Sequence, residues 1–293
     1  MMSSFYIDLV IKTALSEDLT PHPEDRIEIT VDVKEKEFID VTSDAIFHDE
    51  ECQADILAKS EGVLSGSSVV KRVFELVDPS LFLKFRKTDG EPFNKGEKIA
   101  TLKGKIKSIL RGERIALNFL GHLSGIATEV NKLVKILEGT EIKILDTRKT
   151  LPGLRELEKK AVVHGDGENH RMGLYDMILI KDNHIDAAGS ITEAVKRVRV
   201  RYGTRYKIEV ETRWLTEVEE AISCGVDRIM LDNMQKNQIR RAVRIIGGKA
   251  EIEVSGNMNR KSIRKLRNLP VDYISLGYIT NAAGHSDFSM KIK

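Results

Sequence analysis

Cationic side chains gather around two short apolar runs in the middle of the chain, residues 142–145 and 177–180. Four cations and one histidine follow or separate these runs: Arg148, Lys149, His170, Arg171 and Lys181. Arginine presents a planar fork that matches a carboxylate, whereas lysine is a point charge suited to phosphate groups. Together these residues predict an active site that binds anions.

The apolar runs predict the elements that hold this site. Six short runs end at a polar, charged or glycine residue: 142–145, 177–180, 208–210, 229–231, 252–254 and 274–276. Helical patterns lie between most of them, as in the apolar spacing of residues 191–198, and a capping box is expected at Thr216–Glu219. Alternating strands and helices predict a parallel sheet in an α/β fold. A (β/α) barrel is favoured over an open doubly wound sheet.

Further polar residues stand where the later strands end. Glu211 and Asp232 are 232 − 211 = 21 residues apart, one strand-to-strand step, so both carboxylates are expected to face one cavity. Ser255, Gly256 and Gly277 follow the last two strands, where barrels often bind phosphate through backbone N–H groups.

The first hundred residues follow a different pattern and predict a second domain. Residues 52–58 and 81–85 alternate as strands, and residues 69–77 carry a helical stripe, which suits an α+β sandwich. Residues 21–41 look like an insertion without chemistry of their own. A long helix is expected over 111–137, broken near Ser124-Gly125.

Composition fits a globular enzyme. The chain has 293 residues, of which 41% are hydrophobic and 31% charged, and its net charge of +2 argues against a nucleic-acid-binding chain. The basic run 260–267 is read as a solvated helix face. Two cysteines, Cys52 and Cys224, exclude a disulfide scaffold and fit a reducing cytoplasm. Neither a transmembrane run nor a secretory signal is recognised, so a cytoplasmic location without membrane contact is expected.

A set of sequence motifs, in order, resembles the quinolinate phosphoribosyltransferase (carboxylating nicotinate-nucleotide pyrophosphorylase) family, from about residue 42 onward. The motifs are Leu117–Leu120, Leu123–Thr128, Asp146–Thr150, Asn169–Arg171, Ile180–His184, Glu209–Glu211, Leu231–Asn233, Val254–Asn257 and Asp287–Ile292. The resemblance implies a transferase of NAD biosynthesis that forms nicotinate mononucleotide, pyrophosphate and CO2 from quinolinate and phosphoribosyl pyrophosphate.

The resemblance also implies roles for individual residues. Quinolinate would be bound by Arg114, Arg148, His170 and Arg171, and pyrophosphate by Lys149 and Lys181. Ribose and the waters of Mg2+ would be bound by Glu211 and Asp232, and the 5′-phosphate by Ser255, Gly256 and Gly277. Lys149, Lys181, Glu211 and Asp232 are expected to be catalytic, with no all-protein metal cage.

The resemblance carries expectations for assembly and domains as well. Arg114 would reach the site of a neighbouring subunit, which implies a homodimer with shared sites, or a hexamer built from such dimers. The predicted domains are an α+β sandwich over 1–116, joined by a C-terminal strand within 285–293, and an α/β barrel over 117–284.

Some residues depart from the family's usual sequence, and others are interpreted as structural rather than catalytic. Asp166 stands where a third glycine is common, and Gly284-His285-Ser286 replaces more usual apolar residues. Asp146 is read as structural, His122 as packing or helix surface, and His184 as either a cap or a substrate contact.

Three alternative functions stay open from the sequence. They are a related phosphoribosyltransferase for another heteroaromatic acid, as in homologues found with molybdate transport; a metal-dependent barrel hydrolase using His170, His184, Glu211 and Asp232; and a nucleic-acid-binding module.

Overall fold

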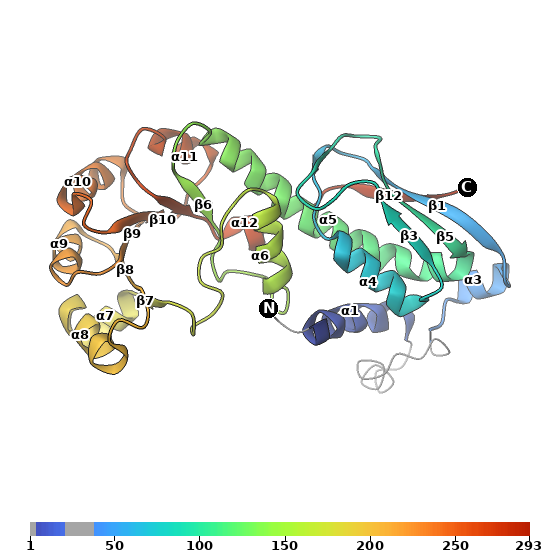
Figure 1. Ribbon diagram of the computed structural model, residues 1–293, viewed down its shortest axis with the longest axis horizontal. Helices are drawn as coiled ribbons and strands as arrows, with labels where there is room; N and C mark the ends of the chain where they lie inside the picture. The colour runs from blue at the N-terminus through green and yellow to red at the C-terminus, as the bar shows by residue number, and fades with distance from the viewer. Residues whose placement is uncertain (1–3, 21–37) are drawn as a thin grey trace. The chain divides into compact units, whose positions relative to one another are not determined.

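The computed structural model describes residues 4–20 and 38–293. The chain divides into two compact units, each built from separate segments (Figure 1). Unit 1 comprises 1–129, 151–166 and 283–293, and unit 2 comprises 130–150 and 167–282. Most of the expected insertion at 21–41 lies outside the described residues.

Unit 1 contains a four-stranded antiparallel sheet. Its strands, in sheet order, are β12 (Phe288–Ile292), β1 (Glu51–Ala58), β5 (Lys98–Lys105) and β3 (Phe82–Phe85). A separate pair joins β2 (Gly62–Val63) to β4 (Pro92–Phe93). Alternation along β1 buries Ala54, Ile56 and Ala58, as the sequence predicts. The late strand β12 pairs with β1, from Ala54 opposite Ile292 to Ala58 opposite Phe288.

Among the described residues, five helices lie wholly or mainly in unit 1. They are α1 (Ser4–Leu19), α3 (Val41–Ile46), α4 (Ser67–Val77), α5 (Ile106–Ile136) and α6 (Arg155–His164). The apolar stripe predicted for α4 is buried at Val69, Val70, Val73, Phe74 and Val77. This single buried face explains why the segment forms an amphipathic helix. The helix α6 belongs to unit 1 although it lies in the chain between two strands of unit 2.

The expected break near Ser124-Gly125 is wrong, because α5 runs without interruption from Ile106 to Ile136. Gly125 serves close packing: a Cβ atom there would lie 1.9 Å from the carbonyl oxygen of Gly284. Ser124 is fully buried and its hydroxyl donates to the backbone oxygen of Ser65. Both small residues therefore mark a tight contact on a continuous helix.

Unit 2 is built on a six-stranded parallel sheet, which confirms the α/β fold. In sheet order the strands are β6 (Lys143–Leu145), β11 (Tyr273–Ser275), β10 (Glu251–Ser255), β9 (Arg228–Asp232), β8 (Ile208–Thr212) and β7 (Ile178–Ile180). All six correspond to predicted runs. The sheet is barrel-like, with β6 and β7 at its ends, and a bridge from Leu145 to Glu168 extends it beyond β6.

Helices follow the strands of unit 2, and in Figure 1 α8, α9 and α10 form a row along one side of the sheet. The helices are α7 (Asp182–Ala188), α8 (Ile191–Tyr202), α9 (Leu215–Ser223), α10 (Lys236–Ile246), α11 (Arg260–Leu266) and α12 (Tyr278–Asn281). Within the described residues, no helix is long and apolar enough to span a bilayer.

The capping box expected at Thr216–Glu219 is wrong in register. The helix α9 already begins at Leu215, so Thr216 lies inside its first turn. Glu217 instead accepts the backbone N–H of Arg213 at 2.6 Å and pairs with its guanidinium at 2.7 Å. This carboxylate therefore satisfies a backbone donor at the helix start in place of the threonine hydroxyl.

Candidate active site

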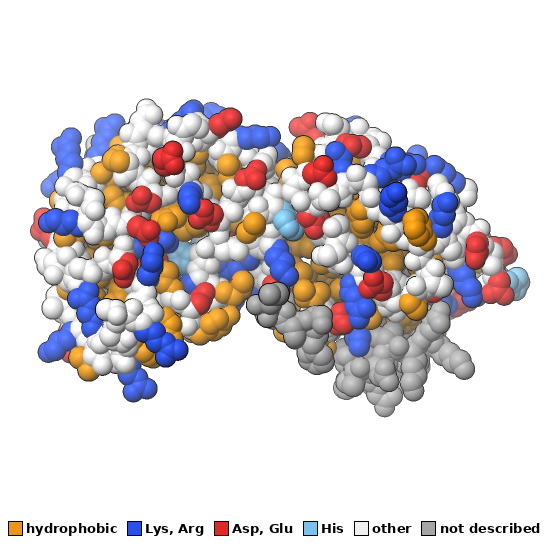
Figure 2. All heavy atoms as spheres, in the orientation of Figure 1, with side chains coloured by type: hydrophobic (Ala, Val, Ile, Leu, Met, Phe, Trp, Pro, Cys, Tyr) orange, Lys and Arg blue, Asp and Glu red, His pale blue; other side chains and the backbone are white. Residues whose placement is uncertain are grey.

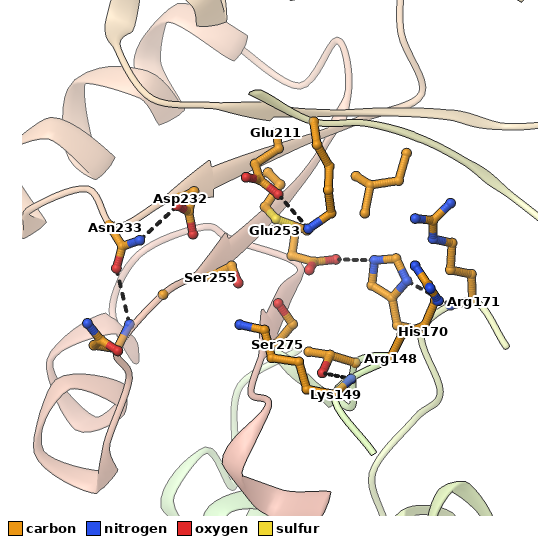
Figure 3. A pocket seen from close by; sticks show the side chains of 16 residues that line it. Arg148, Lys149, His170, Arg171, Glu211, Asp232, Asn233, Glu253, Ser255 and Ser275 are labelled. Atoms are coloured by element: carbon orange, nitrogen blue, oxygen red, sulfur yellow. Dashed lines mark hydrogen bonds and ion pairs between the residues drawn. The ribbon is translucent and has the colours of Figure 1, made fainter. Parts of the chain in front are cut away.

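A cavity of about 440 Å3 lies at the carboxyl ends of the strands of unit 2. Nine of the eleven predicted site residues line it: Arg148, Lys149, His170, Arg171, Lys181, Glu211, Asp232, Ser255 and Gly256. They converge because the carboxyl ends of parallel strands meet at one edge of the sheet. Figure 3 shows these side chains around the cavity.

The loop after β6 carries Arg148 and Lys149. The backbone N–H of Lys149 donates to Oγ1 of Thr147 at 3.0 Å, and its carbonyl accepts from Oγ1 of Thr280 at 2.7 Å. A Cβ atom at Gly277 would lie only 2.7 Å from Cδ of Lys149. Gly277 thus leaves room for the lysine chain, although it does not itself line the cavity.

Positive charge is concentrated beside this loop. Arg171 donates through NH1 to the carbonyl of Met177 at 3.1 Å. Burial lowers the pKa of Arg171, and the nearby charge of Arg148 lowers it further. Two guanidinium groups held this close repel each other, and an anion between them would relieve that repulsion.

Two carboxylates stand on the adjacent strands β8 and β9, as the spacing predicts. Oε2 of Glu211 lies 3.2 Å from Nζ of Lys181, the residue that precedes helix α7. Asp232 accepts from Nδ2 of Asn233 at 2.7 Å. The cavity therefore holds acidic groups opposite its cations, and Figure 3 shows Glu211 and Asp232 side by side on their strands.

The loop after β10 wraps around Asn233. Gly256 has φ of 120°, and a Cβ there would lie 2.4 Å from Oδ1 of Asn233. That same oxygen accepts the backbone N–H of Asn257 at 3.2 Å. Asn233 thus ties Asp232 to the 255–257 loop, and only glycine fits this geometry without strain.

Several residues that the sequence left outside the catalytic set have clear structural contacts. Asp146 is fully buried, and its Oδ1 accepts the backbone N–H of His170 at 2.9 Å, which confirms a structural role. His184 caps α7, because its Nδ1 accepts the N–H of Lys181. His122 is buried with Nε2 2.8 Å from Glu158. Asp166 has φ of 67°, which explains why a glycine suits this position.

Arg114 is not among the residues that line this cavity. It is an exposed residue of α5 and belongs to unit 1. Its expected contribution to a neighbouring subunit stays a prediction.

Sequence reasoning missed several residues of the site. Asn233, Asn257, Glu253 and Ser275 also line the cavity, and Glu209 lies buried behind it. The available signal was a charged residue inside an apolar run, as in Ile208-Glu209-Val210 and Ile252-Glu253-Val254. Such a carboxylate requires a partner within the fold.

A hydrolytic metal centre built from His170, His184, Glu211 and Asp232 does not form. In the described part of the chain, the group with metal-like spacing is instead His170, Glu209 and Glu253. The basic run in α11 is a solvated face, since Ile263 and Leu266 are buried and the cations point outward. Figure 2 likewise shows Lys and Arg interspersed with Asp and Glu on the face drawn.

A barrel-like sheet whose carboxyl edge gathers cations and carboxylates defines an enzyme site for anionic substrates. Residues 40–124 match the family described as "Quinolinate phosphoribosyl transferase, N-terminal domain", and residues 126–291 match its C-terminal domain. The chain belongs to the quinolinate phosphoribosyltransferase family.

Individual relatives agree with this placement. The chain is 44% identical over 253 residues to the "Probable nicotinate-nucleotide pyrophosphorylase [carboxylating]" of Bacillus subtilis, covering 86% of this chain and 88% of that one. A chloroplastic nicotinate-nucleotide pyrophosphorylase of Arabidopsis thaliana is 40% identical, with 83% and 75% covered. The crystal structure of NadC from Streptococcus pyogenes superposes with a TM-score of 0.90 at 39% identity, covering 100% and 98%.

Proposed function

We propose that the protein transfers the phosphoribosyl group of phosphoribosyl pyrophosphate to quinolinate and removes one carboxylate, forming nicotinate mononucleotide, pyrophosphate and CO2. The observation that carries this proposal is the cavity in unit 2, where four cations lie together with two carboxylates at the ends of adjacent strands. The cations are Arg148, Lys149, Arg171 and Lys181, and the carboxylates are Glu211 and Asp232. Both substrates are dense anions joined at a ribose, and this charge pattern matches them.

The two arginines are assigned to the quinolinate carboxylates. Arg148 and Arg171 are close enough to depress the pKa of Arg171, so a dicarboxylate between them replaces repulsion with attraction. His170 lies on the same wall of the cavity. These features support a quinolinate site on the Arg148, His170 and Arg171 side.

The opposite side suits phosphoribosyl pyrophosphate. Ser255 and Gly256 offer backbone N–H groups to the 5′-phosphate, where the missing side chain permits close approach. Glu211 and Asp232 accept hydrogen bonds from the ribose hydroxyls and favour the positive charge that develops at C1′. Lys149 and Lys181 attract the pyrophosphate.

The reaction then needs orientation more than covalent help. The pyridine nitrogen forms a bond to C1′ as the bond to pyrophosphate breaks, leaving a ring cation. The ring cation stabilises the carbanion that remains on the ring carbon when the adjacent carboxylate leaves as CO2, and that carbon takes up a proton from Lys149 or Lys181. Holding the two substrates in line can supply roughly 7–11 kcal/mol of barrier reduction.

Magnesium belongs to this proposal as a companion of phosphoribosyl pyrophosphate. The donor set fits it: Glu211 and Asp232 are oxygen ligands at one cavity and can hold its waters, while the substrate phosphates supply further oxygens. The ion neutralises the leaving pyrophosphate when bound.

Two broader elements complete the proposal. The exposed Arg114 would complete a neighbouring subunit's site, which requires a homodimer, or a hexamer of such dimers. The reaction would take place in the cytoplasm, because two free cysteines fit a reducing compartment.

The test is a product assay. Purified protein is incubated with phosphoribosyl pyrophosphate, Mg2+ and either quinolinate or nicotinate, and mononucleotide and CO2 are followed. Product from quinolinate alone is expected. Product from nicotinate, or from neither acid in a folded protein, would contradict the proposal and direct the search to other heteroaromatic acids.

A further inference from the structure

A buried cluster supports the quinolinate side of the cavity, and the mechanism above uses only His170 from it. Nε2 of His170 lies 3.1 Å from Oε2 of Glu209 and 3.6 Å from Oε2 of Glu253. Glu209 and Glu253 are fully buried and His170 is 8% exposed. On the far side, Arg228 places NH1 3.2 Å from Oε2 of Glu253. Figure 3 shows Glu253 and the ring of His170 facing each other.

The hydrogen bonds around His170 define its tautomer. Nδ1 accepts the backbone N–H of Arg171 at 2.7 Å, and a nitrogen that accepts carries no proton. The ring proton therefore sits on Nε2, which faces the two carboxyl groups. In this geometry His170 is a neutral ring, and its contribution to the cavity passes through Arg171.

The backbone on either side of the ring is held as well. The N–H of His170 donates to the buried Asp146, and the next N–H, that of Arg171, donates to the ring. Arg171 in turn reaches the carbonyl of Met177. The direction in which Arg171 leaves the backbone thus depends on how the His170 ring is oriented.

Two buried carboxyl groups can remain this close because they need not both be charged. Burial raises the pKa of Glu209 to about 7, and burial together with the charge of Glu209 raises the pKa of Glu253 to about 7. The cation of Arg228 opposes both shifts, and for Glu253 a hydrogen bond with Ser275 also opposes the shift, as would a positive charge on a doubly protonated His170 ring. A proton held by one carboxyl group and the charge of Arg228 together offset the negative charge beneath an anion-binding cavity.

The same three side chains have the spacing of a metal site. Arg228 argues against that use, because its guanidinium already lies against Glu253 and would repel a cation. Arg228 is itself held by Glu251 at 3.0 Å and stacks 3.9 Å from the ring of Tyr273. The arrangement is that of an ion-pair support with its positive charge built in.

We propose that Glu209, Glu253 and Arg228 are positioning residues that hold His170 as a neutral ring protonated on Nε2, so that its Nδ1 orients Arg171 toward the quinolinate carboxylate. The substrate assignment rests on the proposed function, whereas the tautomer does not. The positive charge that meets quinolinate then comes from the arginines, and His170 supplies their alignment.

The first test needs no substrate, and its main result comes from the wild-type protein. Nitrogen-15 NMR of histidine-labelled protein, with the His170 signals identified by their loss in His170→Asn, should show a neutral ring at pH 7, protonated on Nε2 alone. A doubly protonated ring, or a proton on Nδ1, would overturn the proposal. So would a stoichiometric metal ion in the wild-type protein that is lost in Glu253→Gln.

The second test is kinetic. Replacing Glu253 by Leu should raise KM for quinolinate roughly tenfold to hundredfold through misalignment, with KM for phosphoribosyl pyrophosphate within about twofold. Glu253→Gln, which keeps the shape and a hydrogen-bond acceptor, should recover most of the loss. Equal increases in both KM values, or no recovery with glutamine, would reject the positioning role.

Glu193→Gln is the control. Glu193 on α8 also pairs with an arginine, Arg197, at 2.8 Å, but it is 39% exposed and outside the His170 cluster. This variant should keep both KM values. If the wild-type enzyme makes no product, the proposed function fails while the NMR result still decides the tautomer.

Discussion

Gly256 offers the sharpest test of how the phosphate side of the cavity is built. Replacing Gly256 by Ala imposes two separate costs. The backbone φ of 120° is strained for any side chain, which costs about 1–3 kcal/mol. The new Cβ would also lie 2.4 Å from Oδ1 of Asn233, so the asparagine must move. Its movement breaks the 2.7 Å hydrogen bond from Asn233 to Asp232.

The second cost is the one that should affect catalysis. A hydrogen bond to a charged group contributes about 1.5–3 kcal/mol, and each 1.36 kcal/mol is a factor of ten in rate. Gly256→Ala should therefore lower kcat/KM for phosphoribosyl pyrophosphate by about 10- to 150-fold, measured with quinolinate at saturation.

Gly248→Ala separates the two costs. Gly248 also has a positive φ, 76°, but a Cβ there meets nothing within 4 Å, and it does not line the cavity. This variant should lose stability through strain and keep its kcat/KM. Were Gly256→Ala to match Gly248→Ala within about threefold in kcat/KM, the Asn233 bridge would have no role in the site.

Three further variants test other parts of the structure. Arg148→Ala should raise KM for quinolinate by tenfold or more in steady-state assays, in keeping with charge-assisted bonds of about 1.5–3 kcal/mol, with much less effect on phosphoribosyl pyrophosphate; equal loss for both substrates would reassign Arg148. Asp232→Asn should lower kcat at least tenfold with the circular dichroism spectrum unchanged, and wild-type turnover would remove the ribose and magnesium role. Asp55→Asn should cost about 1–3 kcal/mol in urea unfolding at pH 7. Burial acts to raise the pKa of Asp55, but hydrogen bonds from Lys293, Lys98 and Thr101 outweigh it and hold the pKa well below its usual range. The lowered pKa means that this stability is present above about pH 4 and is lost as the pH falls further, so the difference between wild type and variant should shrink there.

The sequence was informative where local pattern and local chemistry agree. Apolar runs that stop at polar, charged or glycine residues predicted all six strands of unit 2, because a buried parallel strand must be apolar whereas its end lies at the polar edge of the sheet. For the same reason the cavity contains the predicted cations and carboxylates. The spacing of Glu211 and Asp232 sufficed because neighbouring strands are also neighbours in the chain.

The buried cluster could not be predicted in the same way. Glu209 and Glu253 come from β8 and β10, which are separated in the sheet by β9, and they meet a histidine from an irregular segment. Only the three-dimensional register brings these together. The expected helix break at Ser124-Gly125 failed for a related reason: small residues signal flexibility in a local reading, but here they permit contact with Gly284, which is distant in sequence.

The pairing of β1 with β12 also constrains how the chain folds during synthesis. The start of β12 at Phe288 follows the end of β1 at Ala58 by 288 − 58 = 230 residues. At about 5–20 residues per second, a ribosome needs roughly 10–50 seconds to add them. Throughout that interval β1 presents an unpaired edge, which is a template for association with other chains. Any product truncated before residue 288 keeps that edge exposed. Premature termination is therefore expected to cause aggregation as well as loss of activity.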